Sequence, residues 1–393
     1  MKKIKRTLSN MDMPLLIVTV ILFVFGLLNI VNASTQAVVI KYGHGLYSYF
    51  YKQLFSLLLG LVGAVIIIKI PTKKYYKWIP ILYIGALILL LYLYLFGKSY
   101  LGSVNWINIM GFKFQPSEIA KPIMICAVSL AIEKFCSKLR NNVKYTRADH
   151  FKFIGIIILI GILFPALIYL EKDLGTCIIL LIIFGVLFLG SPIQRKEKMN
   201  IIILALIAMV IGLLIALLKG GLLTEEQLSR LDFKDPCSNY EEGGYQICNG
   251  FIAINSGGLL GVGIGNSKQV SYLPESHTDS VFAIIAEEYG FIICSIIFLL
   301  YLIVLYRIFN LASHTSTIRG KYICLGIGTY IAVHIIVNLG GLFGSMPLTG
   351  VPLPFLSYGG SYTLSLVCSL AIVQRISIEK NTERIKIRWL LWI

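Results

Sequence analysis

The feature that most limits what this chain can fold into is its series of long apolar segments. A helix needs about 20 mostly apolar residues to cross the hydrocarbon core of a bilayer. Backbone polar groups in lipid must pair within the span, so such segments predict transmembrane helices. We count ten candidate spans, at 14–32, 50–70, 78–96, 117–136, 152–170, 173–191, 200–218, 281–306, 321–342 and 357–376.

The composition agrees with a membrane protein and excludes several other classes. Hydrophobic residues make up 57% of the chain and charged residues 14%, whereas soluble domains are about a quarter charged. This excludes an ordinary cytosolic enzyme and a disordered chain. The net charge of +16 would suit a nucleic-acid binder, but the basic residues lie between the apolar runs. We therefore expect membrane lipid and no nucleic acid as partners.

The distribution of Lys and Arg predicts the orientation of the chain. With the N-terminus in the cytoplasm, 25 of the 35 Lys and Arg residues fall on the inner side and 8 on the outer side. The positive-inside rule then puts both termini in the cytoplasm. The predicted fold class is an all-α integral membrane protein with ten transmembrane helices, forming one polytopic domain over 1–393. A large extracytoplasmic loop at 219–280 joins helices 7 and 8, and a basic cytoplasmic tail covers 377–393.

Two features of the long outer loop have more than one interpretation. Cys237 and Cys248 could form a local disulfide or remain free thiols, because spacing alone proves neither. The run SGGLLGVGIG at 256–265 is not a dinucleotide-binding fingerprint, since its spacing differs and no soluble strand precedes it. Its glycines either pack the loop against helices or bring backbone close to a phosphate, and we favour packing.

Ionisable and polar residues inside the spans are candidate functional residues, because their burial in lipid is costly. Glu118 and Lys121 are three apart on one face of a helix that begins near Pro116, so they can pair. The pair is either a structural ion pair or part of a substrate site. His334 and Asn338 are four apart in the ninth span and are expected to hydrogen bond to neighbouring helices.

The acidic residue at the outer mouth of the eighth span is the candidate for chemistry. Asp279 is either a general base at the membrane surface or the N-cap of the helix. His277 two residues earlier is weak evidence for a metal site. Glu287 and Glu288 lie about two turns deeper, and we expect them to find buried structural partners.

Four segments carry a recognisable pattern. They read FQPSEIAK at 114–121, KDLGT at 172–176, YLPESHTD at 272–279 and PLTGVPLPFLSYGGS at 347–361. Their residues, their order and their placement relative to the spans are similar to those of the SEDS family (shape, elongation, division and sporulation). This is the FtsW/RodA/SpoVE group of bacterial cell-wall polymerases. The resemblance covers nearly the whole chain.

The resemblance implies a ten-helix peptidoglycan glycosyltransferase of the bacterial cytoplasmic membrane. It would polymerise lipid II into glycan strands on the outer face, with a class B penicillin-binding protein, a transpeptidase, as its partner. The essential acidic residue of the family falls on Asp279. The matching segments give as substrate-binding candidates Glu118, Lys121, His277 and Ser357. The tryptophan of the loop before the first segment falls on Trp106, which is a further candidate.

The chain also departs from the family pattern. Asn105 stands where an Arg commonly precedes the tryptophan, and Ser280 stands where Phe is usual. If the Arg holds pyrophosphate, another cation must replace it here, and Lys113, Lys121 or Lys268 could serve. A divalent cation such as Mg²⁺ or Mn²⁺ is the other possibility, and the sequence does not choose between them.

The mechanism expected from this resemblance is a single inverting displacement. A base takes the proton of a sugar hydroxyl, and positive groups relieve the charge of the leaving pyrophosphate. We assign the base to Asp279. One alternative is a transporter that flips lipid II, although the polar residues gather at the outer ends of helices. Another is a non-catalytic scaffold that recruits the penicillin-binding protein. The sequence does not distinguish elongation, division and sporulation.

Overall fold

The computed structural model describes residues 9–36, 47–97, 105–109, 112–141, 146–218, 235–238, 240, 244–274 and 276–390. Much of the predicted outer loop, including 219–234, lies outside these residues. Each of the ten predicted spans coincides with a helix in this part of the chain. These helices are α2 (Met13–Gln36), α3 (Ser48–Lys69), α4 (Tyr75–Phe96), α5 (Pro116–Asn141), α6 (Arg147–Leu170), α7 (Leu174–Gly190), α8 (Arg195–Leu218), α11 (Val281–His314), α12 (Ile318–Leu342) and α13 (Gly360–Leu390).

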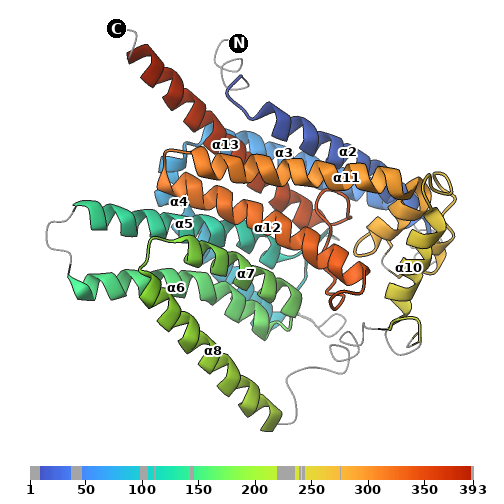
Figure 1. The fold of residues 1–393 in the computed structure, drawn as a ribbon, viewed down its shortest axis with the longest axis horizontal. Coiled ribbons are helices and arrows are strands. Elements are labelled where there is room, and N and C mark those ends of the chain that lie inside the picture. Colours follow the sequence, from blue (N-terminus) through green and yellow to red (C-terminus); the bar gives the residue numbers. More distant parts are fainter. Residues whose placement is uncertain are drawn as a thin grey trace.

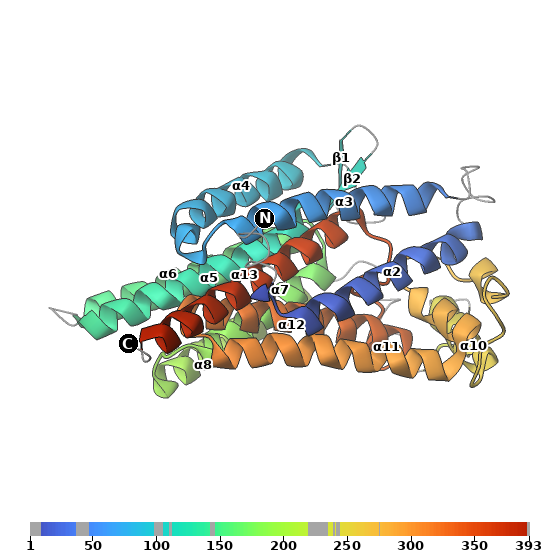
Figure 2. The same ribbon diagram turned by 90° about the horizontal axis from the view of Figure 1, so that it is seen from above.

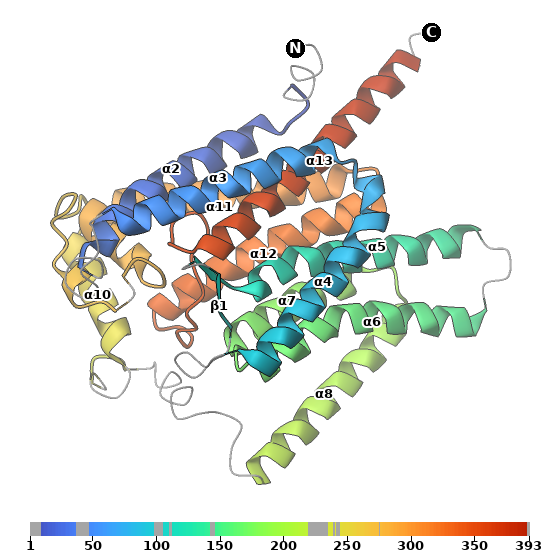
Figure 3. The same cartoon turned by 180° about the vertical axis from the view of Figure 1, so that it is seen from behind.

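Length and apolar composition support membrane crossing for most of these helices. Seven helices in the described residues are long and apolar enough to cross a membrane, and α7 is apolar but shorter. The spans of α12 and α13 are largely buried, whereas those of α3 and α4 are mostly exposed on the outside of the bundle. Figures 1 and 3 show α8 directed away from the other helices.

Small residues let α3 approach α13 closely. A Cβ atom at Gly60 would lie 3.1 Å from the Cβ of Val367, and one at Gly63 would lie 3.1 Å from Cys368 Sγ. Close backbone approach through small residues is a common way for transmembrane helices to associate. Figure 2 shows α13 running through the bundle between the outer helices.

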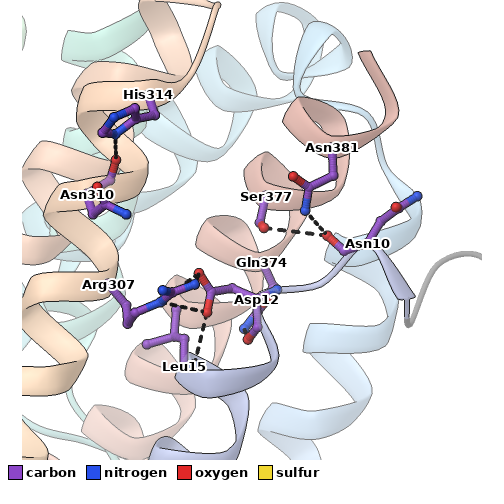
Figure 4. A network of polar contacts seen from close by, with 9 residues as sticks. All are labelled: Asn10, Asp12, Leu15, Arg307, Asn310, His314, Gln374, Ser377 and Asn381. Carbon is purple, nitrogen blue, oxygen red and sulfur yellow. Dashed lines mark hydrogen bonds and ion pairs between the residues drawn. The ribbon is translucent and has the colours of Figure 1, made fainter. Parts of the chain in front are cut away.

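The two ends of the chain meet at one end of the bundle. Asp12 caps α2 by accepting a hydrogen bond from Leu15 N at 3.1 Å, and it forms an ion pair with Arg307 of α11 at 2.8 Å. Gln374 of α13 accepts from Asp12 N at 2.9 Å. Figure 4 shows this network together with the contacts of Asn10 to α13. The first described residues therefore contact α11 and α13 at this end of the bundle.

The predicted spans 152–170 and 173–191 are only two residues apart, which requires a tight helical hairpin, and the turn between α6 and α7 confirms it. Lys172 adopts a φ of 61°, which reverses the chain within the three residues that separate the helices. Asp173 then begins α7 as its N-cap, because its carboxylate accepts a hydrogen bond from Thr176 N at 3.0 Å. In the Asp-Leu-Gly-Thr segment, Asp173 thus has a structural role as the helix cap.

The connections contain regular structure that the sequence pattern did not predict. Helix α10 (Tyr245–Gly257) lies inside the predicted long loop, at the end of the bundle away from the termini (Figure 1). A short hairpin precedes α5, and α13 continues well into the predicted tail. Cys237 and Cys248 form a disulfide, which settles the alternative that the sequence left open. The short elements are β1 (Ile107–Ile109), β2 (Phe112–Phe114), η2 (Thr72–Lys74) and η4 (Gln269–Ser271).

Candidate functional site

Asp279 lies in the turn that leads into α11. The N-cap position of α11 is Ser280, and its side chain makes no capping hydrogen bond. The N-cap position expected for Asp279 is thus one residue further along, at Ser280. The residue as a whole is half-buried at the mouth of the helix.

The backbone around Asp279 is held by the loop between α12 and α13. Three consecutive carbonyl groups, those of residues 277 to 279, each accept a hydrogen bond from that loop or from α12. The donors are Tyr358 N to His277 O at 2.8 Å, Ser357 Oγ to Thr278 O at 2.6 Å, and Asn338 Nδ2 to Asp279 O at 2.9 Å. Such paired backbone groups fix the position of the side chain they carry.

The same loop also borders the carboxylate itself. Asn338 Nδ2 donates a second hydrogen bond, to Val351 O at 2.8 Å. Gly350 next to it has a φ of 71°, and a Cβ atom there would lie 3.5 Å from Asp279 Oδ2. A glycine is favoured at this φ, and it leaves the carboxylate side of the turn open.

A buried ion pair lies on α5, beside α12. Lys121 Nζ contacts Glu118 Oε1 at 2.8 Å and His334 Nε2 at 3.1 Å. His334 Nδ1 lies 3.2 Å from the carbonyl oxygen of Pro352. Because a carbonyl can only accept, Nδ1 carries the hydrogen and Nε2 accepts from the Lys121 ammonium. The pair predicted from the sequence is thus present and extended by a histidine.

This arrangement joins the ion pair to the turn that carries Asp279. His334 and Asn338 lie one helical turn apart on α12 and hydrogen bond to the carbonyls of Pro352 and Val351. The expected contact with a neighbouring helix is confirmed for His334, through Lys121 of α5, whereas Asn338 bonds to the connecting segments. The side chain of Lys121 is 1% exposed. Its ammonium therefore lies inside the bundle. Through His334 it supports the loop between α12 and α13.

Two other candidates, His277 and Ser357, are also buried. The His277 ring lies 4.5 Å from the Tyr49 ring and 5.6 Å from the Tyr358 ring, measured between centroids. The Ser357 hydroxyl donates to Thr278 O and accepts from Leu353 N at 2.8 Å. These contacts give Ser357 a direct part in positioning the turn.

The remaining candidates lie on the surface of connecting segments. Trp106 is 37% exposed and comes immediately before β1. Lys268 is exposed in the segment between α10 and α11, where its backbone N–H donates to Glu287 Oε1 at 3.1 Å. Asn105 donates to Asp173 Oδ2 at 3.2 Å, so the position of the expected Arg here carries an amide bound to the start of α7.

Sequence reasoning missed one buried acid at the same end of the molecule. Glu171 follows α6 directly and is 1% exposed, and neither carboxylate oxygen has a hydrogen-bond partner among the described residues. Burial, with a smaller contribution from the charge of Asp173, raises the pKa of Glu171 to about 8. The sequence signal that could have identified Glu171 is its position directly after an apolar run.

No group of three or more His, Cys, Asp or Glu side chains in the described part of the chain is arranged to hold a metal ion. The described site has Asp279, a half-buried residue, on a turn whose backbone carbonyls are hydrogen-bonded. A buried polar network lies behind it.

Comparisons with known proteins give a consistent match. Residues 13–382 match the profile of a family described as cell cycle protein, FtsW/RodA/SpoVE. A probable peptidoglycan glycosyltransferase FtsW of Bacillus subtilis (strain 168) is 33% identical over 386 residues, which cover 95% of this chain and 92% of that protein. The corresponding protein of Hydrogenovibrio crunogenus is 33% identical over 367 residues, covering 91% and 89%.

Solved structures share the fold. A chain from a study of the structural coordination of polymerization and crosslinking by a peptidoglycan synthase complex has a TM-score of 0.72 at 22% identity, covering 94% of this chain and 98% of that one. The rod shape determining protein RodA of Thermus thermophilus has a TM-score of 0.65 at 23% identity, covering 94% and 97%. At these identities the matches establish the arrangement of helices.

Proposed function

The chain belongs to the FtsW/RodA/SpoVE family of cell cycle proteins, and from this premise we propose that it polymerises lipid II as a peptidoglycan glycosyltransferase. It is a multi-pass membrane protein, and its relatives carry the name peptidoglycan glycosyltransferase. In our proposal ten helices cross the bacterial cytoplasmic membrane with both termini inside. The reaction then takes place at the outer face.

The observation that carries the proposal is the fixed turn around a half-buried carboxylate. Asp279 is the acidic residue whose backbone is held by α12 and by the loop after it. A base must be placed within hydrogen-bond reach of the proton it takes. A turn whose successive carbonyls are all hydrogen-bonded keeps the carboxylate in place, and the residue is half-buried.

The proposed reaction is one displacement at the anomeric carbon of the donor. Asp279 accepts the proton of the acceptor sugar hydroxyl as its oxygen bonds to that carbon. The bond from the same carbon to the pyrophosphate oxygen breaks, and its electron pair leaves with the lipid pyrophosphate. One base and one displacement give inversion, with no covalent sugar on the protein.

The other candidates divide into two groups in this proposal. Lys268 and Trp106 are exposed and would contact the headgroup, with Lys268 giving charge relief to pyrophosphate. Glu118, Lys121, His277 and Ser357 are buried. They would affect substrate binding indirectly, by fixing the turn that carries Asp279 and the loop between α12 and α13.

A transpeptidase partner is part of the proposal. One solved structure with this fold comes from a peptidoglycan synthase complex that coordinates polymerization and crosslinking. We propose that this chain works beside a class B penicillin-binding protein in the same way.

The test is polymerisation of lipid II by the purified chain in liposomes, with and without the penicillin-binding protein. Asp279→Asn keeps the size of the side chain and removes the base, so glycan product should fall by several orders of magnitude. Asp235→Asn is the matched control, because Asp235 is an exposed acid of the same outer segment. It should retain the parental rate.

The same liposomes separate the alternatives. Near-parental glycan synthesis by Asp279→Asn would remove this residue from the base role. Headgroup translocation without glycan product in the parental protein would favour the flippase. Neither activity, whether the partner is present or not, would favour the scaffold.

A further inference from the structure

Helix α11 is interrupted at one residue. Gly290 has φ 73° and ψ −177° inside an otherwise continuous helix from Val281 to His314. Such a break leaves carbonyl groups before it and N–H groups after it without partners in the helix. In a membrane these groups must be satisfied by other protein groups.

The glycine-rich segment 258–265, here called the apolar loop, supplies those partners. The loop donates to the carbonyls before the break and accepts from the N–H groups after it. The bonds are Val262 N to Glu287 O at 2.9 Å, Gly263 N to Glu288 O at 3.1 Å, Phe291 N to Gly258 O at 2.9 Å and Ile292 N to Leu259 O at 3.3 Å. The loop and the broken helix therefore satisfy each other.

The fit depends on glycine at the contact. A Cβ atom on Gly290 would lie 2.3 Å from Gly261 N, and one on Gly261 would lie 2.2 Å from Glu288 O. No side chain larger than hydrogen fits either place without movement. This confirms packing, rather than approach to a phosphate, as the role of these two glycines.

Two buried carboxylates hold the end of the loop. Glu288 accepts from Gly265 N at 3.0 Å, and Glu287 accepts from Lys268 N and from Gln269 N at 3.2 Å. Glu287 and Glu288 thus find the buried structural partners expected from the sequence. The polar groups of the loop base point inward, toward protein.

The side chains of the apolar loop point the other way. Leu259 is 68% exposed, Leu260 79% and Ile264 65%, and Phe291 beside them is 65% exposed. The sequence from Gly243 to Ser267 has no charged residue. A contiguous exposed apolar surface of this kind marks an interaction site.

The position of the surface along α11 indicates that lipid covers it. From Phe291 to Arg307, where the ion pair with Asp12 lies, α11 rises about 24 Å at 1.5 Å per residue. The hydrocarbon core is about 30 Å thick. Exposed apolar residues of α11 recur along this length: Ile292, Ile296, Phe298, Leu299, Leu302 and Tyr306.

We propose that the apolar loop is a re-entrant element that inserts Leu259, Leu260 and Ile264 among the acyl chains of the outer leaflet. Its surface is continuous with the lipid-facing side of α11, and its backbone is satisfied as lipid requires. The loop thereby anchors the start of α11, and the turn that precedes it, at a fixed depth in the membrane.

The test uses a photoreactive diazirine amino acid at single positions of the full chain in nanodiscs of phosphatidylethanolamine and phosphatidylglycerol. Position 260 reports on the loop. Position 298, in the exposed apolar face of α11, is the lipid reference. Position 271, a serine near Lys268 at the polar base of the loop, is the control away from the acyl chains. Mass spectrometry after illumination counts lipid adducts and protein adducts.

We expect lipid adducts at position 260 at a yield close to that at position 298 and several-fold above that at position 271. A yield at 260 no higher than at 271 would overturn the proposal. Adducts at 260 that join two protein chains would also overturn it, because a second copy would then cover the loop. The variant labelled at position 298, prepared in parallel, sets the lipid-adduct yield expected of a residue that faces the acyl chains.

Discussion

Asn338 is the residue through which α12 holds Asp279. It is 3% exposed and donates to two carbonyls on different segments, those of Asp279 and Val351. A side chain of this kind contributes most when its loss leaves buried acceptors without partners. Asn338 therefore connects stability and activity at a single position.

We predict that Asn338→Leu lowers both stability and glycan synthesis. Two buried carbonyls lose their donor, which should cost about 1–3 kcal/mol of folding free energy. The displaced turn should lower kcat more than it raises KM, because bound substrate no longer meets a fixed base. Thermal unfolding and polymerisation at varied lipid II measure the two effects.

The control for this variant is Thr329→Val on the same helix, which removes a hydrogen bond internal to α12. It should leave kcat unchanged. In an Asp279→Asn background, Asn338→Leu should cause no further loss of rate. A further loss there would mean that Asn338 acts independently of Asp279.

At the scale of elements, the turn from α6 to α7 is expected to depend on pH. The pKa of Glu171 is raised from 4.5 to about 8 in the folded protein, because burial disfavours its charged form. The folded state therefore binds a proton that the unfolded state has lost between these values. Stability should fall as pH rises from 4.5 to about 8. Above that pH, Glu171 is ionised in both states and should cause no further change in stability.

Glu171→Gln tests this dependence directly. The variant cannot ionise, so its unfolding temperature should fall less than that of the parental protein across the same pH range. At about pH 8 the variant should be the more stable of the two. Equal pH profiles would show that Glu171 keeps its ordinary pKa.

The break in α11 gives a second prediction at this scale. Gly290→Ala puts a Cβ atom against Gly261 N and forces alanine to a positive φ. The backbone strain alone should cost about 1–3 kcal/mol, and the unfolding temperature should fall. Gly155→Ala is the matched control, because a Cβ there meets open space on α6. It should be neutral or stabilising, and equal effects of the two substitutions would contradict the role given to Gly290.

For the whole molecule, the features that could be predicted from the sequence are those set by local period and length. The helix positions, the hairpin at Lys172 and the pairing of Glu118 with Lys121 all depend on neighbours within a few residues. Contacts between distant segments were beyond such a prediction. Nothing in the spacing of Asn338 and Asp279, which lie 59 positions apart, indicates that one holds the other.

The same limit applies to the long outer segment. Its glycines predicted packing, but the partner is the break at Gly290, which no sequence period reveals. Helix α10 was missed because it is short, with 13 residues. A helix of that length beside a disulfide depends on tertiary contacts more than on its own periodicity.

The network at the termini leads to the last prediction. Arg307→Leu removes the cation from Asp12, whose side chain is 8% exposed, and leaves a buried carboxylate without its partner (Figure 4). The loss should lower the unfolding temperature, by less than the roughly 3–5 kcal/mol of a fully buried pair, because Arg307 is 31% exposed. Adding Asp12→Asn removes the charge and keeps an N-cap, so it should recover part of the loss.

This network lies at the end of the bundle away from α10 and the start of α11 (Figure 1), so the rate of glycan synthesis per folded molecule should stay at the parental level in both variants. A rate that falls while the protein remains folded would show that the two ends of the bundle are coupled.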